Sequence, residues 1–241
     1  NADQFEQIID DINSTGFGLT SGLHSRIDAT IDQWLDKVHA GNLYVNRNTV
    51  GAVVGVQPFG GMGLSGTGPK AGGPLYLQRL VKSEAWTLAD LEGEAVIETD
   101  KLAQAVRQTL TGEQQSEALA LLQTLRQKSP LAQVYKMQGI TGENNYLRFE
   151  ARPIIAVSNG SLFAQIKALI AIAVCGSKAV VKKDSPLAEY AHQFAEYLTV
   201  ADDLNSLPKL SVMIVLEPLS GEERQHYAER SGAILTYVES L

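Results

Sequence analysis

Glycine is distributed very unevenly along this chain, and its distribution constrains the fold more than any other feature. Thirteen of the 21 glycines lie in the first 80 residues, and nine fall between Gly51 and Gly73. Because glycine weakens helix and strand interiors and favours turns, this stretch predicts a long loop. A long loop within a compact domain is usually either functional or disordered. The chain therefore has parts of different character.

Composition limits the class of protein. The 241 residues have room for one large domain or two small ones. With 44% hydrophobic and 20% charged residues, a globular core is favoured over disorder. The net charge of −7 and the pI near 5.1 argue against contact with nucleic acid, which usually requires a basic face. A single cysteine, Cys175, excludes an intrachain disulfide and fits a reducing compartment.

We divide the chain into residues 1–80, a connecting region over 81–145 with one helix or two, and residues 146–241. The elements predicted for the first part are a helix over 5–12, a strand over 18–24, a helix over 27–38, a strand over 43–45 and a loop over 46–74. No apolar run near Cys175 approaches the roughly 20 residues that cross a bilayer, so no transmembrane segment is expected.

The last part alternates between strand and helix patterns. The predicted strands cover 153–157, 178–181, 210–216 and 233–238, and the predicted helices cover 161–175, 186–199 and 221–230. This alternation predicts a parallel sheet with right-handed crossovers, and so a Rossmann-like α/β domain.

Several motifs point to chemistry only weakly. Gly61, Gly63 and Gly66 match G-x-G-x-x-G, but the residues that follow cannot open a helix, as a dinucleotide site requires. Cys175 ends an apolar helix, which predicts a buried packing residue rather than a nucleophile. The four histidines lack the spacings of a metal site. We therefore assign no catalytic, cofactor-binding or metal-binding residue to this chain.

The loop offers a different kind of site. The consecutive backbone N–H groups of Gly51 and Ala52 can form a nest for an anion such as a carboxylate. Phe59, a few residues later, can form a wall for an aliphatic chain. These residues alone do not distinguish such a binding loop from a rigid surface loop without a ligand.

The sequence of this loop carries a family resemblance. Residues 46–74 read NRNTVGAVVGVQPFGGMGLSGTGPKAGGP, and residues 13–28 read NSTGFGLTSGLHSRID. Both resemble the C-terminal part of the aldehyde dehydrogenase catalytic domain. More narrowly, they resemble the L-glutamate γ-semialdehyde (1-pyrroline-5-carboxylate) dehydrogenase module of the bifunctional proline utilisation A flavoenzymes. The resemblance covers about residues 3–80.

The resemblance implies roles for particular residues. The N–H groups of Gly51 and Ala52 would bind the substrate carboxylate, and Phe59 would pack on its methylene chain. The family's nucleophilic cysteine and general-base glutamate would precede this chain, so the chain alone is expected to be inactive. The whole enzyme would oxidise proline to glutamate, with FAD in its proline dehydrogenase module and NAD in its semialdehyde dehydrogenase module.

A second resemblance follows in an unexpected order. Residues 159–163 (NGSLF) and 176–183 (GSKAVVKK) resemble the N-terminal half of an aldehyde dehydrogenase cofactor domain. Lys183 matches the lysine that binds the adenosine ribose, but Pro186 stands where the partner glutamate is usual. The segment 139–146 (GITGENNY) resembles the signature that leads into the extra C-terminal domain of the longer family members. This implies a degenerate, non-catalytic cap over the dehydrogenase module that binds no cofactor.

Three functions follow as hypotheses. In the first, the chain completes the semialdehyde dehydrogenase site and supplies the cap. In the second, residues 146–241 form a working nucleotide-binding module with Lys183 on the ribose. In the third, the chain is an assembly element, with Trp86 and its neighbours in an interface. The expected partners are upstream modules of the same polypeptide, glutamate semialdehyde and further copies of the chain. We expect a cytoplasmic protein, with peripheral membrane association left open for the whole enzyme.

Overall fold

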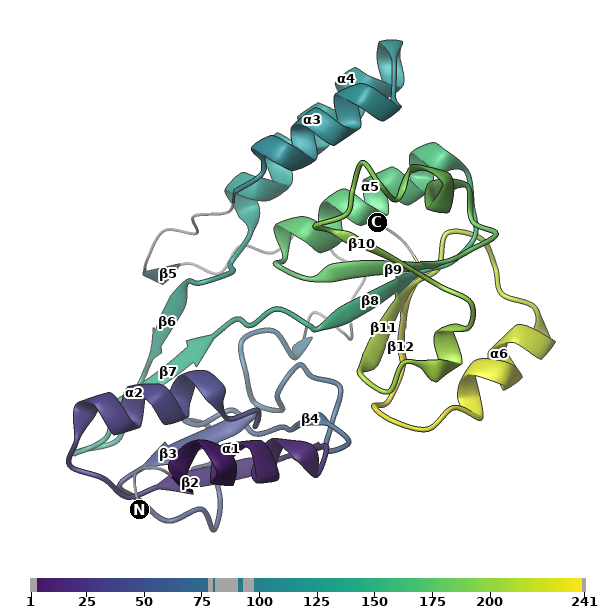
Figure 1. Cartoon of the computed structure of the whole chain (residues 1–241). Helices are drawn as coiled ribbons and strands as arrows, with labels where there is room; N and C mark the ends of the chain where they lie inside the picture. The colour runs from purple at the N-terminus through teal and green to yellow at the C-terminus, as the bar shows by residue number, and fades with distance from the viewer. Residues whose placement is uncertain (1–3, 78–79, 81–90, 93–97, 240–241) are drawn as a thin grey trace. The chain divides into compact units, whose positions relative to one another are not determined.

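The computed structural model describes residues 4–77, 80, 91–92 and 98–239, and these form two compact units (Figure 1). The first unit comprises residues 1–90, 136–146 and 232–234, and the second comprises 91–135, 147–231 and 235–241. The domain boundaries at 80 and 145 stay a prediction. Trp86, named in the assembly hypothesis, lies outside the described residues.

The first unit is built from two helices and short strands. In chain order its elements are α1 (Phe5–Ser14), β1 (Phe17–Gly18), β2 (Thr20–Leu23), α2 (Asp28–Lys37), β3 (Asn42–Val45) and β4 (Met62–Gly63). Strands β2 and β3 run parallel, and β1 pairs antiparallel with β4. The two predicted helices and the strand at 43–45 are confirmed. The predicted strand over 18–24 is divided into β1 and β2.

The core of the first unit is small. It consists of Ile9 from α1, Trp34 from α2, and Val38 and Ala40 from the segment that follows α2. Large apolar side chains elsewhere in the unit are exposed, including Ile8, Phe17, Leu19, Ile27, Val50, Val54, Leu77 and Leu80. The hydrophobic effect favours covering such side chains, so the first unit leaves considerable apolar surface for a partner.

The second unit begins with two helices and a small sheet. Helices α3 (Asp100–Thr109) and α4 (Gly112–Lys128) confirm the helical part of the connecting region. Strands β5 (Leu91–Glu92), β6 (Val134–Met137) and β7 (Asn145–Arg148) form a three-stranded sheet that the sequence patterns do not predict. The loop 138–144 joins β6 to β7, and residues 136–146, which include this loop and the adjoining ends of both strands, are grouped with the first unit.

A five-stranded parallel sheet dominates the second unit. Its elements are β8 (Ile154–Val157), α5 (Leu162–Val174), β9 (Lys178–Lys182), η3 (Pro186–Tyr190), β10 (Leu198–Ala201), η4 (Leu204–Ser206), β11 (Leu210–Ile214), α6 (Gly221–Ala228) and β12 (Thr236–Val238). The strand order is β10-β9-β8-β11-β12. Numbered from β8, this is 3-2-1-4-5, the order of a Rossmann sheet. The predicted α/β class is confirmed.

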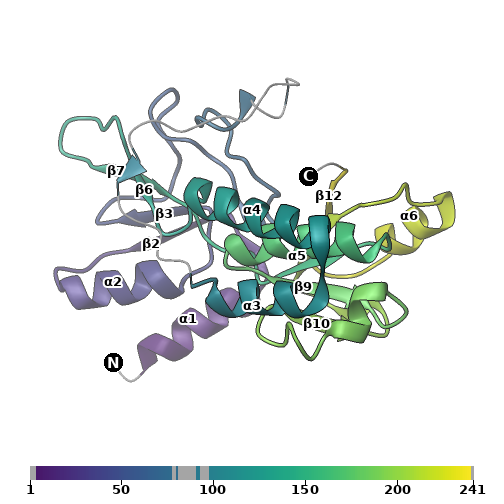
Figure 2. The same cartoon turned by 90° about the horizontal axis from the view of Figure 1, so that it is seen from above.

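Helix α5 is the centre of the larger core. It is apolar on nearly all sides and packs against α4, beside which it lies in Figure 2. Its start is capped by Ser161, whose Oγ accepts the N–H of Ala164 at 3.2 Å, as predicted from the sequence. A helix that is apolar all round must be buried, and α5 accordingly separates the sheet from solvent.

The predicted helix over 186–199 is wrong. Only Pro186–Tyr190 is helical, as a 3₁₀ turn, and the chain then continues in turns to β10. Leu198 to Ala201 pair in parallel with Ala179 to Lys182 and form the edge strand of the sheet. Pairing with β9 satisfies the backbone groups of these residues, so tertiary contact overrides the local helix preference.

Candidate functional site

The predicted binding loop leaves β3 at an asparagine with an unusual backbone. Asn46 has φ of 56°, a conformation that asparagine tolerates better than most residues. Its side chain accepts the N–H of Ser25 at 2.9 Å through Oδ1 and donates to the Ser25 carbonyl at 2.9 Å through Nδ2. These two hydrogen bonds between Asn46 and Ser25 fix the direction in which the loop leaves β3.

Arg47 folds back over the start of the loop. Its Nη2 donates to the carbonyl of Gly51 at 3.0 Å, and its Nη1 donates to Oε1 of Gln57 at 3.0 Å. The guanidinium also lies 4.7 Å from the ring centre of Tyr44 on β3. These contacts tie both ends of the segment 51–57 to a strand of the first unit.

Gly51 and Ala52 present two consecutive backbone N–H groups that have no partner among the described residues. The N–H groups on either side are both engaged: Val50 donates to Asn48 Oδ1 at 3.2 Å, and Val53 donates to Gln57 Oε1 at 2.9 Å. A Cβ added at Gly51 would meet no atom within 4 Å. These two N–H groups are therefore available to a ligand, and their role as an anion site stays a prediction.

A tight turn closes the segment. The carbonyl of Val53 accepts the N–H groups of Val56 and Gln57 at 3.1 and 2.9 Å. Gly55 adopts φ of 80°, which side chains disfavour, so a glycine is required there. The turn returns the chain to Gln57, which is buried, and leads directly into Pro58 and Phe59.

Phe59 is held by contacts on both sides of its backbone. It exchanges two hydrogen bonds of 3.0 Å with Ala71. Asn42, at the start of β3, donates to the Pro58 carbonyl at 2.8 Å and accepts the N–H of Gly60 at 3.2 Å. Phe59 is half-buried, so part of its surface can contact a ligand.

The G-x-G-x-x-G motif has a structural role. Gly61 precedes β4 and Gly63 lies within it. Among the described residues no helix follows this strand directly, whereas a dinucleotide fingerprint connects a strand to a helix. A Cβ on Gly61 would lie 2.6 Å from Ser65, and Gly63, with φ of 62°, lies against the carbonyl of Gly16. These glycines allow close backbone packing, so the motif here is not a dinucleotide fingerprint.

The lysine of the nucleotide hypothesis is engaged elsewhere. Lys183 forms an ion pair of 2.8 Å with Asp202, and both side chains are mostly exposed. The hydrogen bond and charge of Asp202 raise the pKa of Lys183, and the same contact lowers the pKa of Asp202. Lys183 therefore already has a carboxylate partner in this domain.

A direct contact joins the two segments beside which a nucleotide would be expected to bind in this sheet. In a Rossmann sheet, ligands bind outside the carboxyl ends of the strands where the order reverses, here β8 and β11. Oγ of Ser158, after β8, accepts the N–H of Leu216, after β11, at 2.8 Å. A Cβ on Gly160 would approach Leu216 to 3.0 Å. The segments after β8 and β11 are thus held close together at the switch point.

Cys175 is exposed, which contradicts the prediction that it is buried. It follows the last residue of α5, at the C-cap, where the chain turns away from the apolar core. Burial by neighbouring protein atoms still raises the pKa of its thiol. An accessible but weakly acidic thiol lacks the electropositive setting of a nucleophilic cysteine.

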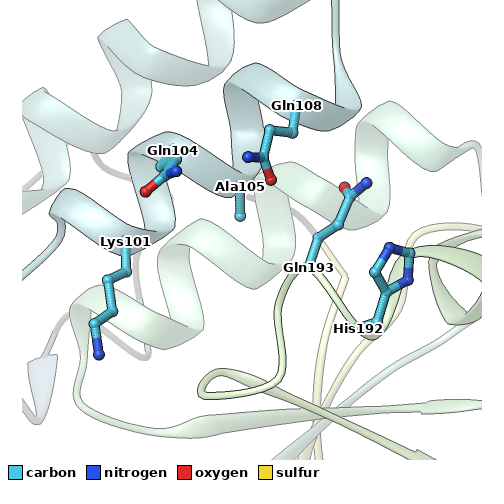
Figure 3. A pocket seen from close by; sticks show the side chains of 6 residues that line it. All are labelled: Lys101, Gln104, Ala105, Gln108, His192 and Gln193. Atoms are coloured by element: carbon cyan, nitrogen blue, oxygen red, sulfur yellow. The ribbon is translucent and has the colours of Figure 1, made fainter.

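A shallow hollow lies between α3 and the turns before β10. It measures about 360 Å³ and is lined by Lys101, Gln104, Ala105, Gln108, His192 and Gln193 (Figure 3). Lys101 is paired with Glu196, and Gln193 bonds Thr109. Within the described ranges, no cluster of three or more potential metal ligands occurs, and no helix is long and apolar enough to cross a bilayer.

Four polar residues that support the loop are absent from the sequence-based prediction. These are Asn42, Arg47, Gln57 and Glu143. The first three lie in or beside the loop that the resemblance identifies, so proximity could have indicated them. Glu143 lies in the 139–146 signature, 96 residues from its partner Arg47, and no spacing rule connects the two.

Known proteins resemble this chain in sequence. Residues 1–85 match the aldehyde dehydrogenase family. The chain is 41% identical over 173 residues to the bifunctional protein PutA of Rhizobium meliloti, covering 70% of this chain and 14% of that protein. It is 42% identical over 90 residues to a 1-pyrroline-5-carboxylate dehydrogenase of a Geobacillus species, covering 37% of this chain and 17% of that protein. The chain thus spans a small part of these relatives.

A solved structure resembles the chain over nearly its whole length. Proline utilisation A from Corynebacterium freiburgense superposes with a TM-score of 0.64 at 26% sequence identity. The match covers 98% of this chain and 22% of that one.

Proposed function

We propose that this chain completes the substrate site of a glutamate semialdehyde dehydrogenase, because residues 1–85 match the aldehyde dehydrogenase family and the chain is similar to proline utilisation A proteins. The dehydrogenase would be the NAD-dependent module of a bifunctional enzyme that oxidises proline to glutamate. The relatives named as PutA and as 1-pyrroline-5-carboxylate dehydrogenase support this substrate class.

One observation carries the proposal. The adjacent N–H groups of Gly51 and Ala52 are unbonded among the described residues, while the groups on either side are bonded. Glutamate semialdehyde carries a carboxylate, and two neighbouring N–H donors would bind its oxygens. A carboxylate held there would fix one end of the substrate.

Phe59 would set the path of the substrate from that end. The Asn42 contacts and the pairing with Ala71 fix the backbone on both sides of Phe59, and so the point from which its ring projects. An aliphatic chain that packs on the ring is removed from water, which favours binding. The aldehyde carbon would then point to a nucleophile from an upstream module of the same polypeptide.

The chemical step needs groups that this chain does not place at the loop. Cys175 belongs to the other compact unit and its thiol pKa is raised, so we assign it no catalytic role. NAD would accept hydride in the upstream module, and FAD would serve the proline dehydrogenase module. What this chain's residues contribute is binding and orientation of the carboxylate end.

We further propose that the second unit is a non-catalytic cap for the dehydrogenase. Its Rossmann strand order supports common ancestry with a cofactor domain. The close contact between Ser158 and Leu216 and the Lys183–Asp202 pair are the observations that favour loss of nucleotide binding. Calorimetric titration of this chain with NAD tests the alternative: micromolar affinity would favour a working nucleotide module over a cap.

Assembly is the remaining candidate, and the exposed apolar side chains of the first unit favour it. Phe17 and Ile27 are each 64% exposed, and Leu80 is 69% exposed. We propose that upstream modules or further copies of the protein cover them, in a cytoplasmic enzyme. Light scattering of this chain and of the complete enzyme distinguishes covering by upstream modules from covering by further copies. Self-association of the chain alone would favour contact between copies.

The substrate role is tested by kinetics of the complete enzyme with Phe59→Ala. We expect KM for the semialdehyde to rise about tenfold, since losing contact with the ring removes roughly 1–2 kcal/mol of apolar burial, with little change in kcat. Phe59→Leu retains an apolar wall and serves as the matched control. Unchanged KM in Phe59→Ala would remove this residue from the site.

A further inference from the structure

Glu143 stands at the centre of a polar cluster behind the proposed carboxylate site. Its Oε2 accepts from Nη1 of Arg47 at 3.1 Å and from Nε2 of Gln57 at 2.9 Å. Gln57 also donates to Oδ1 of Asn145, the first residue of β7, at 3.2 Å. The loop 138–144 thus reaches the two side chains that hold the segment 51–57.

Those two side chains control the orientation of the donor N–H groups. The carbonyl of Gly51 and the N–H of Ala52 belong to one planar, trans peptide, so they point in opposite directions. Arg47 holds that carbonyl at 3.0 Å and therefore turns the Ala52 N–H away from itself. Gln57 holds the N–H of Val53 at 2.9 Å, which fixes the next peptide plane.

Partial burial strengthens the contact between Arg47 and Glu143. The side chains of Arg47 and Glu143 are only 20% and 28% exposed, so their attraction is screened less than that of a surface pair. Nε of Arg47 and the hydroxyl of Tyr44 are buried without a partner among the described residues. Glu143 is the carboxylate that balances this charge and receives its hydrogen bonds.

We propose that Glu143 is a positioning residue for the carboxylate-binding N–H groups of Gly51 and Ala52, acting through Arg47 and Gln57. The proposal rests on the function proposed above. It assigns to the loop 138–144, which lies between two stretches of the second unit in sequence, a part in substrate affinity. Glu143 touches neither substrate nor nucleophile in this scheme.

The first test is amide hydrogen exchange on this chain, and it needs no activity. In Glu143→Ala, Gln57 loses a partner, and we expect exchange at Val53 N–H to accelerate about tenfold or more. Glu143→Gln retains an oxygen acceptor and should restore most of the protection. Glu150→Ala breaks the 2.6 Å pair with Arg148 outside the cluster and should leave Val53 unchanged. Equal protection of Val53 in Glu143→Ala and the wild type would overturn the proposal.

The second test is kinetics of the complete enzyme. Glu143→Ala should raise KM for the semialdehyde about tenfold with kcat nearly unchanged, because only binding of the carboxylate end is weakened. Glu143→Gln should recover most of the affinity, and Glu150→Ala should match the wild type. If Val53 loses protection while KM stays the same, the loop moves without consequence. That result would refute the carboxylate role of Gly51 and Ala52 itself.

Discussion

Gln165 provides the sharpest test of how the second unit is held together. This side chain on α5 is fully buried. Its Nε2 donates to the carbonyl of Ser158 at 3.1 Å, and its Oε1 accepts the hydroxyl of Ser185 at 2.9 Å and the N–H of Leu187 at 3.0 Å. One amide therefore joins the segment after β8 to the segment after β9.

The substitution Gln165→Leu keeps the approximate volume and removes all three bonds. Leaving a buried group without its partner costs about 1–3 kcal/mol. The hydroxyl of Ser185 can rotate toward another acceptor, so the main cost comes from the Ser158 carbonyl and the Leu187 N–H. Burying leucine instead of an amide regains roughly 1–2 kcal/mol. We expect a net loss of about 2–4 kcal/mol in the free energy of unfolding.

Urea denaturation of this chain, followed by circular dichroism, measures that loss. Gln225→Leu is the matched control: this glutamine on α6 is exposed and bonds Glu229 at 2.8 Å. A surface change of this kind should alter stability by less than about 0.5 kcal/mol. If Gln165→Leu cost under about 1 kcal/mol, the reasoning from unsatisfied groups would be refuted.

Three further predictions concern helix α6 and the thiol of Cys175. Ser220 and Glu223 form a capping box, so Ser220→Ala should cost about 1 kcal/mol in urea denaturation. Hydrogen bonding to Ser220 lowers the pKa of Glu223, with the larger contribution from the backbone N–H of Ser220 and the smaller one from its side chain. That carboxylate stabilises the fold above its ordinary pKa and loses the effect as pH falls through the lowered value, so Glu223→Ala should destabilise at neutral pH and have little effect in strong acid. Cys175 should react with iodoacetamide in the folded chain, but more slowly at pH 7 than a free cysteine; modification only after unfolding would contradict its exposure.

Local patterns were sufficient for much of the fold and for the existence of the loop at 46–61, whose role in binding stays a prediction. The apolar spacing in α1 and α2 and the strand–helix alternation after residue 153 involve residues that are close together in the sequence. Hydrophobic periodicity can be recognised over such short distances. Gly51, Ala52 and Phe59 follow from a contiguous stretch whose glycines require a loop. The structure agrees with the predicted form of these elements because short-range preference and tertiary packing coincide there.

The features that escaped prediction depend on distant partners. Leu198 joins the sheet because β9 offers an open edge, although its own segment favours helix. Cys175 ends an apolar run yet lies at the C-cap, just outside the buried surface of α5. The pairing of Arg47 with Glu143 spans 96 residues, and no local rule can assign it.

The long separation between Arg47 and Glu143 has a consequence for synthesis on the ribosome. The binding loop emerges well before the residues that hold it, since Gln57 and Glu143 are 86 residues apart. At about 5–20 residues per second, translation delivers Glu143 roughly 4–17 s after Gln57. During that interval the nascent loop lacks its carboxylate partner. The affinity of the site would thus be set only after most of the chain has been translated.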